Sequence, residues 1–240
     1  MTAPQMATLL AVQDLDTELD RHRHRLATLP ERAELAALDA SLVELAGRRQ
    51  AAAAARDEVS ARQRTLEADL EATEARARAV RARLYGGEVS AARELQAMAA
   101  DLEHLAQRRS DLEDRVLAVL DEREPIDAGV DVLDEARTAT VARRDTVVAD
   151  IAAIEADAGA EMADLAAQRV DRAEAVGAAL LATYEGIRSR LGGIGAARLV
   201  GGRCDGCHLT LPATEIDRLK HEPEDVLVTC EHCGRILVRP

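Results

Sequence analysis

The chain has 240 residues, enough for one or two ordinary domains, but it contains no Phe, no Trp and only two tyrosines. Aromatic side chains supply much of the buried area of compact cores, so this composition argues against an ordinary globule. Its Ala, Leu, Arg, Glu and Asp are typical of long helices and coiled coils. The formal net charge of −13 disfavours broad contact with phosphate backbones or anionic lipid.

The N-terminal segment MTAPQMATLLAVQDLDTELD has no basic stretch before an apolar run, so it does not read as a signal peptide. No stretch approaches the ~20 apolar residues of a membrane span. We therefore expect a cytoplasmic protein with no membrane partner. A reducing compartment also suits a chain whose cysteines occur in Cys-x-x-Cys pairs.

The N-terminal residues predict a first helix with its own apolar stripe. The stripe consists of Val12, Leu15, Leu19, His22, Leu26 and Leu29. The run Thr28–Glu31 then reads as a capping box with an early proline. We expect a helix break or kink there, with a shift of register.

Two long heptad seams follow, and each alternates spacings of three and four residues without a slip. The first runs from Leu38 to Leu84, and ten of its 14 positions are apolar; the second runs from Leu95 to Leu165, with 15 apolar positions of 21. A repeat of 3.5 residues sustained this long predicts a left-handed coiled coil. At 1.5 Å per residue, an arm of ~80 residues would be roughly 120 Å long.

A short break separates the seams at about residues 85–90. Gly86 and Gly87 end the first helix, and Ser90 is a candidate N-cap for the second. So short a connection predicts two antiparallel helices within one chain, hence a monomer. The alternative is a weak dimer, because the first seam is poor near Arg49 and Arg56.

Folding the hairpin about the two glycines places Pro125 opposite Gly47. Both residues weaken a helix interior, by ~3 and ~1 kcal/mol respectively. One hypothesis is that the rod bends at this level; the other is that each helix tolerates its weak residue independently.

Arginines occupy several positions of the two seams. They are Arg49, Arg56, Arg109, Arg123, Arg137 and Arg144. They could set the register, as polar core residues do in coiled coils. Alternatively, their stems pack while their charged heads reach flanking carboxylates.

The helical pattern fades after Tyr184, and glycines then mark a flexible joint. We expect a coiled-coil hairpin over residues 1–190 and a small β-rich domain over 191–240. Expected strands are 196–200, paired with 208–211, then 226–229 and 235–238, with a short helix from Pro212 to Leu219. So small a core needs a metal for stability.

All four cysteines lie in this C-terminal part, as two Cys-x-x-Cys pairs: Cys204 with Cys207, and Cys230 with Cys233. Two such knuckles, 22 residues apart, can aim four thiolates at one point, which is the tetrahedral geometry of a structural Zn²⁺ site. Two disulfides or a redox site are the alternatives. His208 and His232 are surplus to the four ligands, and we expect them to be solvated or to lie beside the ligands.

These features together resemble a bacterial family with an N-terminal coiled-coil hairpin and a C-terminal C4-type zinc ribbon. The matching pieces are LYGGEVSAAREL, QAMAADLEHLAQRRSDLED, CDGC and CEHCGRILV. Members of that family include a flagellar regulator and a chlamydial protein that bind sigma-54, and the flagellar regulator is also linked to a flagellin messenger RNA. The resemblance implies a non-enzymatic adaptor in transcription or RNA metabolism.

Two surfaces are candidates for recognition. At the apex, Tyr85, Arg93 and Glu94 could bind a protein partner, since tyrosine and arginine are enriched in interface hot spots; Tyr85 could instead close the end of the coil. In the ribbon, four arginines could touch nucleic acid, which is the alternative function. They are Arg198, Arg203, Arg235 and Arg239.

No catalytic constellation is recognisable in the sequence. It has no glycine-rich phosphate loop, no nucleophile elbow and no metal site with an open position. We therefore expect an adaptor, not an enzyme, that presents its coiled coil and its ribbon to protein partners whose identity the sequence does not give.

Overall fold

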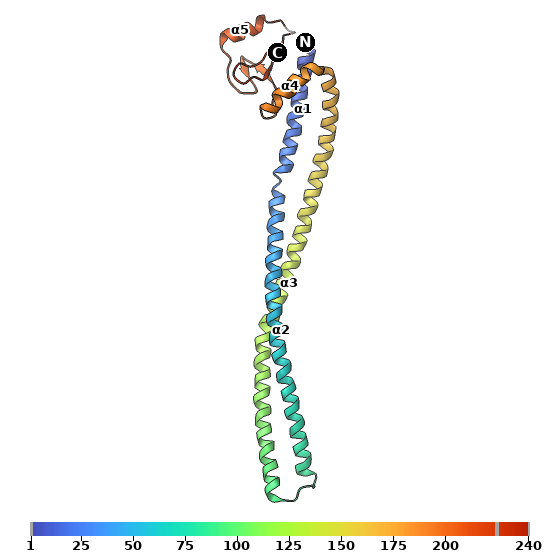
Figure 1. Cartoon of the computed structure of the whole chain (residues 1–240), viewed down its shortest axis with the longest axis vertical. Coiled ribbons are helices and arrows are strands. Elements are labelled where there is room, and N and C mark those ends of the chain that lie inside the picture. Colours follow the sequence, from blue (N-terminus) through green and yellow to red (C-terminus); the bar gives the residue numbers. More distant parts are fainter. Residues whose placement is uncertain (1, 224–225, 240) are drawn as a thin grey trace. The chain divides into compact units, whose positions relative to one another are not determined.

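The computed structural model describes residues 2–223 and 226–239 and is mainly helical (Figure 1). Its elements, in order, are α1 (Ala3–Ala27), α2 (Pro30–Tyr85), α3 (Ala92–Val176), α4 (Ala178–Arg190), β1 (Ala196–Val200), β2 (Arg203–Cys204), α5 (Ala213–His221) and β3 (Ile236–Val238). They form two compact units, one of residues 34–147 and the other of residues 1–33 with 148–240. No helix in the described part of the chain is both long and apolar enough to cross a membrane.

The unit of residues 34–147 is an antiparallel hairpin in which α2 and α3 pack along the two predicted seams. Its core contains Val59 and Leu66 of α2 against Leu112 and Val119 of α3. Every first-seam position is at least partly buried except Arg49 and Arg56, which are exposed. The predicted fold class, a long coiled-coil hairpin followed by a small β-containing ribbon, is therefore confirmed.

The seam arginines mostly direct their charged heads to carboxylates. Arg49 donates to Asp134 at 2.5 Å across the hairpin, and Arg144 donates to Asp39 at 2.7 Å. Arg123 donates to the Gln63 side chain at 2.7 Å. These contacts agree with the second interpretation, in which the guanidinium groups leave the seam for its polar edges.

The expected register of the hairpin is wrong. It would place Arg49 opposite Glu124, whereas Arg49 pairs with Asp134. The connection is longer than two glycines, because α2 ends at Tyr85 and α3 begins only at Ala92. Pro125 therefore does not face Gly47, and both helices continue through these positions, which removes the premise of a shared bend.

Two expected caps are also wrong. The Ala91 carbonyl accepts the first hydrogen bonds of α3, from the N–H groups of Glu94 and Leu95, so Ser90 lies one residue too early to cap the helix. The first hydrogen bond of α2 runs from the Arg32 N–H to the Leu29 carbonyl, so Thr28 lies one residue before the cap, and its hydroxyl donates back to the His24 carbonyl of α1. The break between α1 and α2 and the early position of Pro30 are as predicted.

The second unit joins the ends of the helices to the ribbon through one apolar core. Tyr184 and Leu180 of α4 pack with Leu9 and Val12 of α1, and Ile236 of β3 belongs to the same cluster. Helix α4 extends past Tyr184, contrary to the fading pattern, because its buried face packs on α1 and the ribbon instead of continuing the seam. The predicted boundary at residues 190/191 thus falls inside a shared core.

The ribbon contains a three-stranded sheet in the order β2-β1-β3, with β1 antiparallel to β2 and parallel to β3. The expected pairing of residues 208–211 with the first strand is wrong, because Arg203 and Cys204 take that edge and Thr210 only bridges to Arg203. The short helix α5 and the strand at 236–238 match their predicted positions.

Candidate functional site

The two Cys-x-x-Cys turns share one backbone pattern. The N–H of His208 donates to the Cys204 carbonyl at 2.8 Å, and the N–H of Gly234 donates to the Cys230 carbonyl at 2.7 Å. The residue after each second cysteine has a positive φ, +61° at His208 and +73° at Gly234. Each turn therefore curls tightly and directs both of its sulfurs toward the other turn.

The sulfur atoms of the four cysteines meet the dimensions of a zinc cage. All four Sγ atoms lie within 4.8 Å of one another, with 4.0 Å between Cys204 and Cys233 and 3.9 Å between Cys207 and Cys230. A tetrahedron with Zn–S bonds of about 2.3 Å has sulfurs about 3.8 Å apart, whereas a disulfide bond is about 2.05 Å. All four cysteines are free. The site therefore fits one structural Zn²⁺ and not two disulfides.

Burial and backbone dipoles act oppositely on the thiols when no metal is bound. Burial raises the pKa of Cys230 to about 12. Burial also opposes ionisation of Cys233, but hydrogen bonds from the backbone and side chain of Arg235 outweigh it and lower the Cys233 pKa to about 7. Zinc binding must release the protons of the remaining thiols, as thiolates are the ligands.

The cage is closed on the protein side. Cys204 and Cys230 are buried in a small cluster with Leu211, Leu219 and Leu237. Four thiolates fill the four positions that structural zinc prefers, which leaves none for water or a substrate. Both predicted surplus histidines are exposed and lie outside the ligand cluster.

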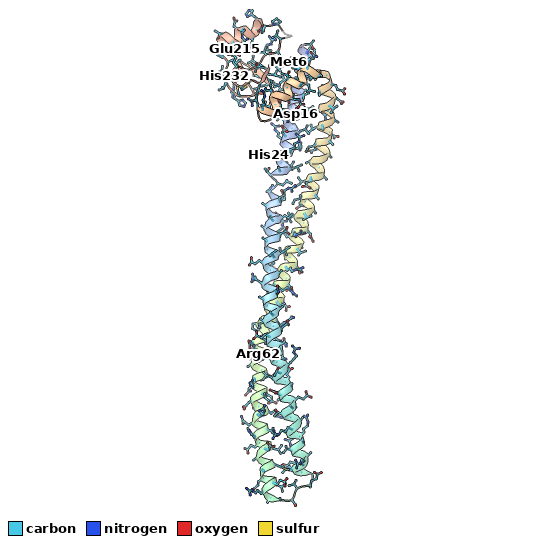
Figure 2. All side chains as sticks on the ribbon, in the orientation of Figure 1. Met6, Asp16, His24, Arg62, Glu215 and His232 are labelled. Carbon is cyan, nitrogen blue, oxygen red and sulfur yellow. The ribbon has the colours of Figure 1, made fainter. Side chains whose placement is uncertain are left out.

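A buried polar network that the sequence analysis missed attaches this ribbon to the helices. Asp16, on α1 and labelled in Figure 2, accepts hydrogen bonds from Arg169 Nε at 2.6 Å and from the Tyr184 hydroxyl at 2.8 Å. Gln13 Oε1 accepts the N–H of Gly195 at 2.7 Å, just before β1. Asp16 and Gln13 are 3% and 5% exposed.

The pKa values of the network follow from its contacts. Burial, and then the hydrogen bond to Asp16, raise the pKa of the Tyr184 hydroxyl far above its usual value. The bond to Asp16 likewise raises the pKa of Arg169. The spacing of Gln13 and Asp16 along α1 was the signal that the sequence offered, since residues three apart share a helix face.

Three of the four ribbon arginines are occupied within the chain. Arg198 forms an ion pair with Asp14 at 2.5 Å. Arg235 donates to the carbonyls of Leu191 and Ile194, and Arg239 donates to those of Leu219, Glu222 and Pro223. Arg203 is exposed and has no ion pair with any described carboxylate.

The apex residues lie together at the turn of the hairpin. Tyr85 is the last residue of α2 and is 78% exposed. Arg93 and Glu94 are exposed in the first turn of α3. Tyr85 therefore does not act as a buried plug of the coil.

Comparison with known proteins gives matches along nearly the whole chain. Residues 12–192 match the CT398-like coiled coil hairpin domain, and residues 203–237 match the C4-type zinc ribbon domain. Uncharacterized proteins MT2288 and Rv2229c, from the CDC 1551 and H37Rv strains of Mycobacterium tuberculosis, are each 31% identical over 237 residues, which cover 98% of this chain and 95% of theirs.

Solved structures show the same fold. A protein from Mycobacterium smegmatis superposes with a TM-score of 0.84 at 26% identity and covers 100% of this chain and 99% of its own. CT398 from Chlamydia trachomatis gives 0.62 at 20% identity, covering 99% and 98%, and HP0958 from Helicobacter pylori gives 0.52 at 15%, covering 98% and 97%. With its paired seams and its four-cysteine cage, the chain belongs to the CT398-like coiled-coil hairpin family and carries a C4-type zinc ribbon.

Proposed function

We propose that the protein is a non-enzymatic adaptor in transcription or RNA metabolism, whose hairpin apex and zinc ribbon bind partner proteins in the cytoplasm. The observation that carries this proposal is the contrast between its two special sites. The four cysteines form a closed metal site that stabilises the fold, whereas Tyr85 at the apex is exposed at the end of a helix pair. The protein acts as a monomer, since each seam finds its partner within the chain.

The ribbon supports a protein contact better than a nucleic-acid contact. Arg198, Arg235 and Arg239 already bind groups of this chain, so using them on phosphate would first break those bonds. Among the described residues of the ribbon, only Arg203 and Lys220 are exposed cations with no carboxylate oxygen within 4.0 Å. Two cations release few counterions, which gives weak binding to a phosphate backbone.

The test is affinity capture with the tagged full chain from its native cell, followed by identification of bound protein and RNA. We expect a protein that is captured by the wild type and is lost when Tyr85→Ala and Arg93→Ala are combined. Arg115→Ala, on the exposed flank of α3, is the matched control and should retain it. Capture of RNA that depends on Arg203 and not on Tyr85 would contradict the adaptor and favour the nucleic-acid alternative.

A further inference from the structure

The charge of the hairpin reverses at its turn. Residues 75–93 contain five arginines and one glutamate, a net charge of +4 in a chain of −13. On either side the hairpin is acidic: residues 34–74 have nine acidic and five basic residues, and residues 94–147 have fourteen acidic and seven basic. The turn is therefore a small basic surface bounded by negative flanks.

Three of the five arginines form no ion pair with the residues that the structure describes. Arg76 pairs with Asp101 at 3.3 Å, and Arg78 pairs with Glu74 at 3.6 Å. Arg81, Arg83 and Arg93 are exposed, and over the described ranges 2–223 and 226–239 none of them lies within 4.0 Å of a carboxylate oxygen. Their charges are available to a partner without breaking an existing ion pair.

The position of Arg93 is unfavourable for the helix that contains it. It lies in the first turn of α3, at the positive end of the helix dipole, where acidic side chains are the stabilising ones. The first N–H groups of this helix have no carbonyl one turn earlier to accept them. A negatively charged group placed here would interact with Arg93 and with the helix end together.

The same turn region also has an exposed aromatic side chain. Tyr85 ends α2 two residues after Arg83 and is 78% exposed, and Leu84 before it and Val89 in the turn are only partly buried. Arg81 lies one turn before Tyr85 on the same face of α2, and tyrosine and arginine are both enriched among interface hot spots. We name Arg81, Arg83, Tyr85 and Arg93 the tip patch.

We propose that the tip patch binds an acidic segment of a partner protein, with aspartate or glutamate carboxylates on the three arginines and an apolar side chain on Tyr85. This inference rests on the adaptor function proposed above and specifies the chemistry of its partner. An acidic peptide can confine its charge to the patch. A nucleic-acid strand would continue past three arginines onto the acidic flanks, where its phosphates are repelled, and it would find a single aromatic ring to stack on.

The test measures fluorescence anisotropy of the full-length protein with two labelled probes. One is a short peptide of aspartate and glutamate around a central leucine, and the other is an oligouridine of equal net charge. The tip variant is Arg81→Gln, Arg83→Gln and Arg93→Gln combined. The matched control is Arg64→Gln, Arg108→Gln and Arg115→Gln, which removes the same charge from exposed positions on the same helices. Circular dichroism verifies that both variants keep the helicity of the wild type.

We expect the peptide to bind the wild type, to lose at least about tenfold in affinity with the tip variant, and to change less than about threefold with the control. Tyr85→Ala should weaken the leucine peptide more than a peptide with glycine in its place. Equal losses in both triple variants would reduce the effect to net charge and overturn the proposal. So would tighter, tip-dependent binding of the oligouridine, an absence of peptide binding, or a wild-type dimer that the tip variant abolishes.

The cellular capture experiment separates this inference from the adaptor function itself. If a captured protein depends on Tyr85 but is unaffected by the three glutamine substitutions, the adaptor stands and the acidic partner is refuted. If no protein depends on the tip at all, both fail.

Discussion

Replacing Tyr184 by phenylalanine should weaken the attachment of the ribbon to the helices, because it removes one buried hydroxyl and little else. That hydroxyl is fully buried and donates to Asp16 at 2.8 Å, and hydrogen bonds to charged groups contribute about 1.5–3 kcal/mol. In the variant, Asp16 still accepts the hydrogen bond from Arg169, so its carboxylate is not left unpaired. We therefore expect a loss of about 1.5–3 kcal/mol and not the larger cost of a stranded charge.

The chain provides a matched control, since Tyr85→Phe makes the same chemical change on an exposed ring with no hydrogen bond to the described residues. That variant should stay within about 0.5 kcal/mol of the wild type. The two tyrosines thus separate the loss of a buried hydroxyl from any general effect of a Tyr→Phe substitution.

Hydrogen–deuterium exchange is the suitable assay, because the protein has two compact units and a single unfolding midpoint would mix them. In Tyr184→Phe, amides of α4 and β1 should exchange roughly 10- to 150-fold faster, while residues 34–147 stay unchanged. Exchange in α4 that matches Tyr85→Phe would refute the reasoning, since the hydroxyl would then contribute nothing measurable.

Three further predictions follow from the same contacts. In a Tyr85→Phe background, tyrosinate absorbance from Tyr184 should appear only well above pH 10, because the folded protein raises the pKa of its hydroxyl. The hydroxyl of the unfolded chain ionises near pH 10, so the free energy of unfolding keeps this contribution below pH 10 and falls by about 1.4 kcal/mol per pH unit above it. Ionisation of Tyr184 near pH 10 while the protein is still folded would contradict this prediction. His208→Gly should stabilise the ribbon by up to about 1 kcal/mol, and Gly234→Ala should destabilise it by about as much, because both positions have positive φ. The temperature at which zinc is released should therefore rise in the first variant and fall in the second. A change of this temperature in the same direction in both variants would count against the strain argument. Cys207→Ser should lower the zinc content, measured by metal analysis, below one ion per chain. It should also speed amide exchange in the ribbon and α4 but not in residues 34–147. An undiminished zinc content would exclude the four cysteines as the metal site.

The sequence contains the heptad period, and that period was sufficient to predict the two helices and their antiparallel pairing. It was not sufficient to predict the register, because register depends on the length of the turn, and glycines at 86 and 87 do not tell where α3 begins. The size of the error in the register is seen at Arg49, which pairs with Asp134 and not with Glu124. The zinc ligands were predictable for the opposite reason, since Cys-x-x-Cys spacing encodes local geometry that needs no long-range information.

The polar network of Asp16 and Tyr184 could not be predicted in the same way. A polar residue beside an apolar stripe usually faces water, and Gln13 and Asp16 are buried only because α3, α4 and the residues before β1 converge on them from more than 150 positions away. The prediction that residues 208–211 pair with the first strand was wrong for a related reason. Which segment takes a short sheet edge is decided by tertiary packing more than by the β-propensity of the segment itself.

The shared core also changes what zinc does for this protein. A ribbon linked to the helices only by a flexible joint would lose its own fold without metal and leave them untouched. Here Ile236 of the ribbon packs in one cluster with Leu9 of α1 and Tyr184 of α4, and Gly195 comes so close to the Tyr184 ring that an added Cβ would lie 2.8 Å from it. Metal binding therefore stabilises the helix ends as well as the cage. The hairpin of residues 34–147 has its own apolar seam, so its stability does not depend on the metal.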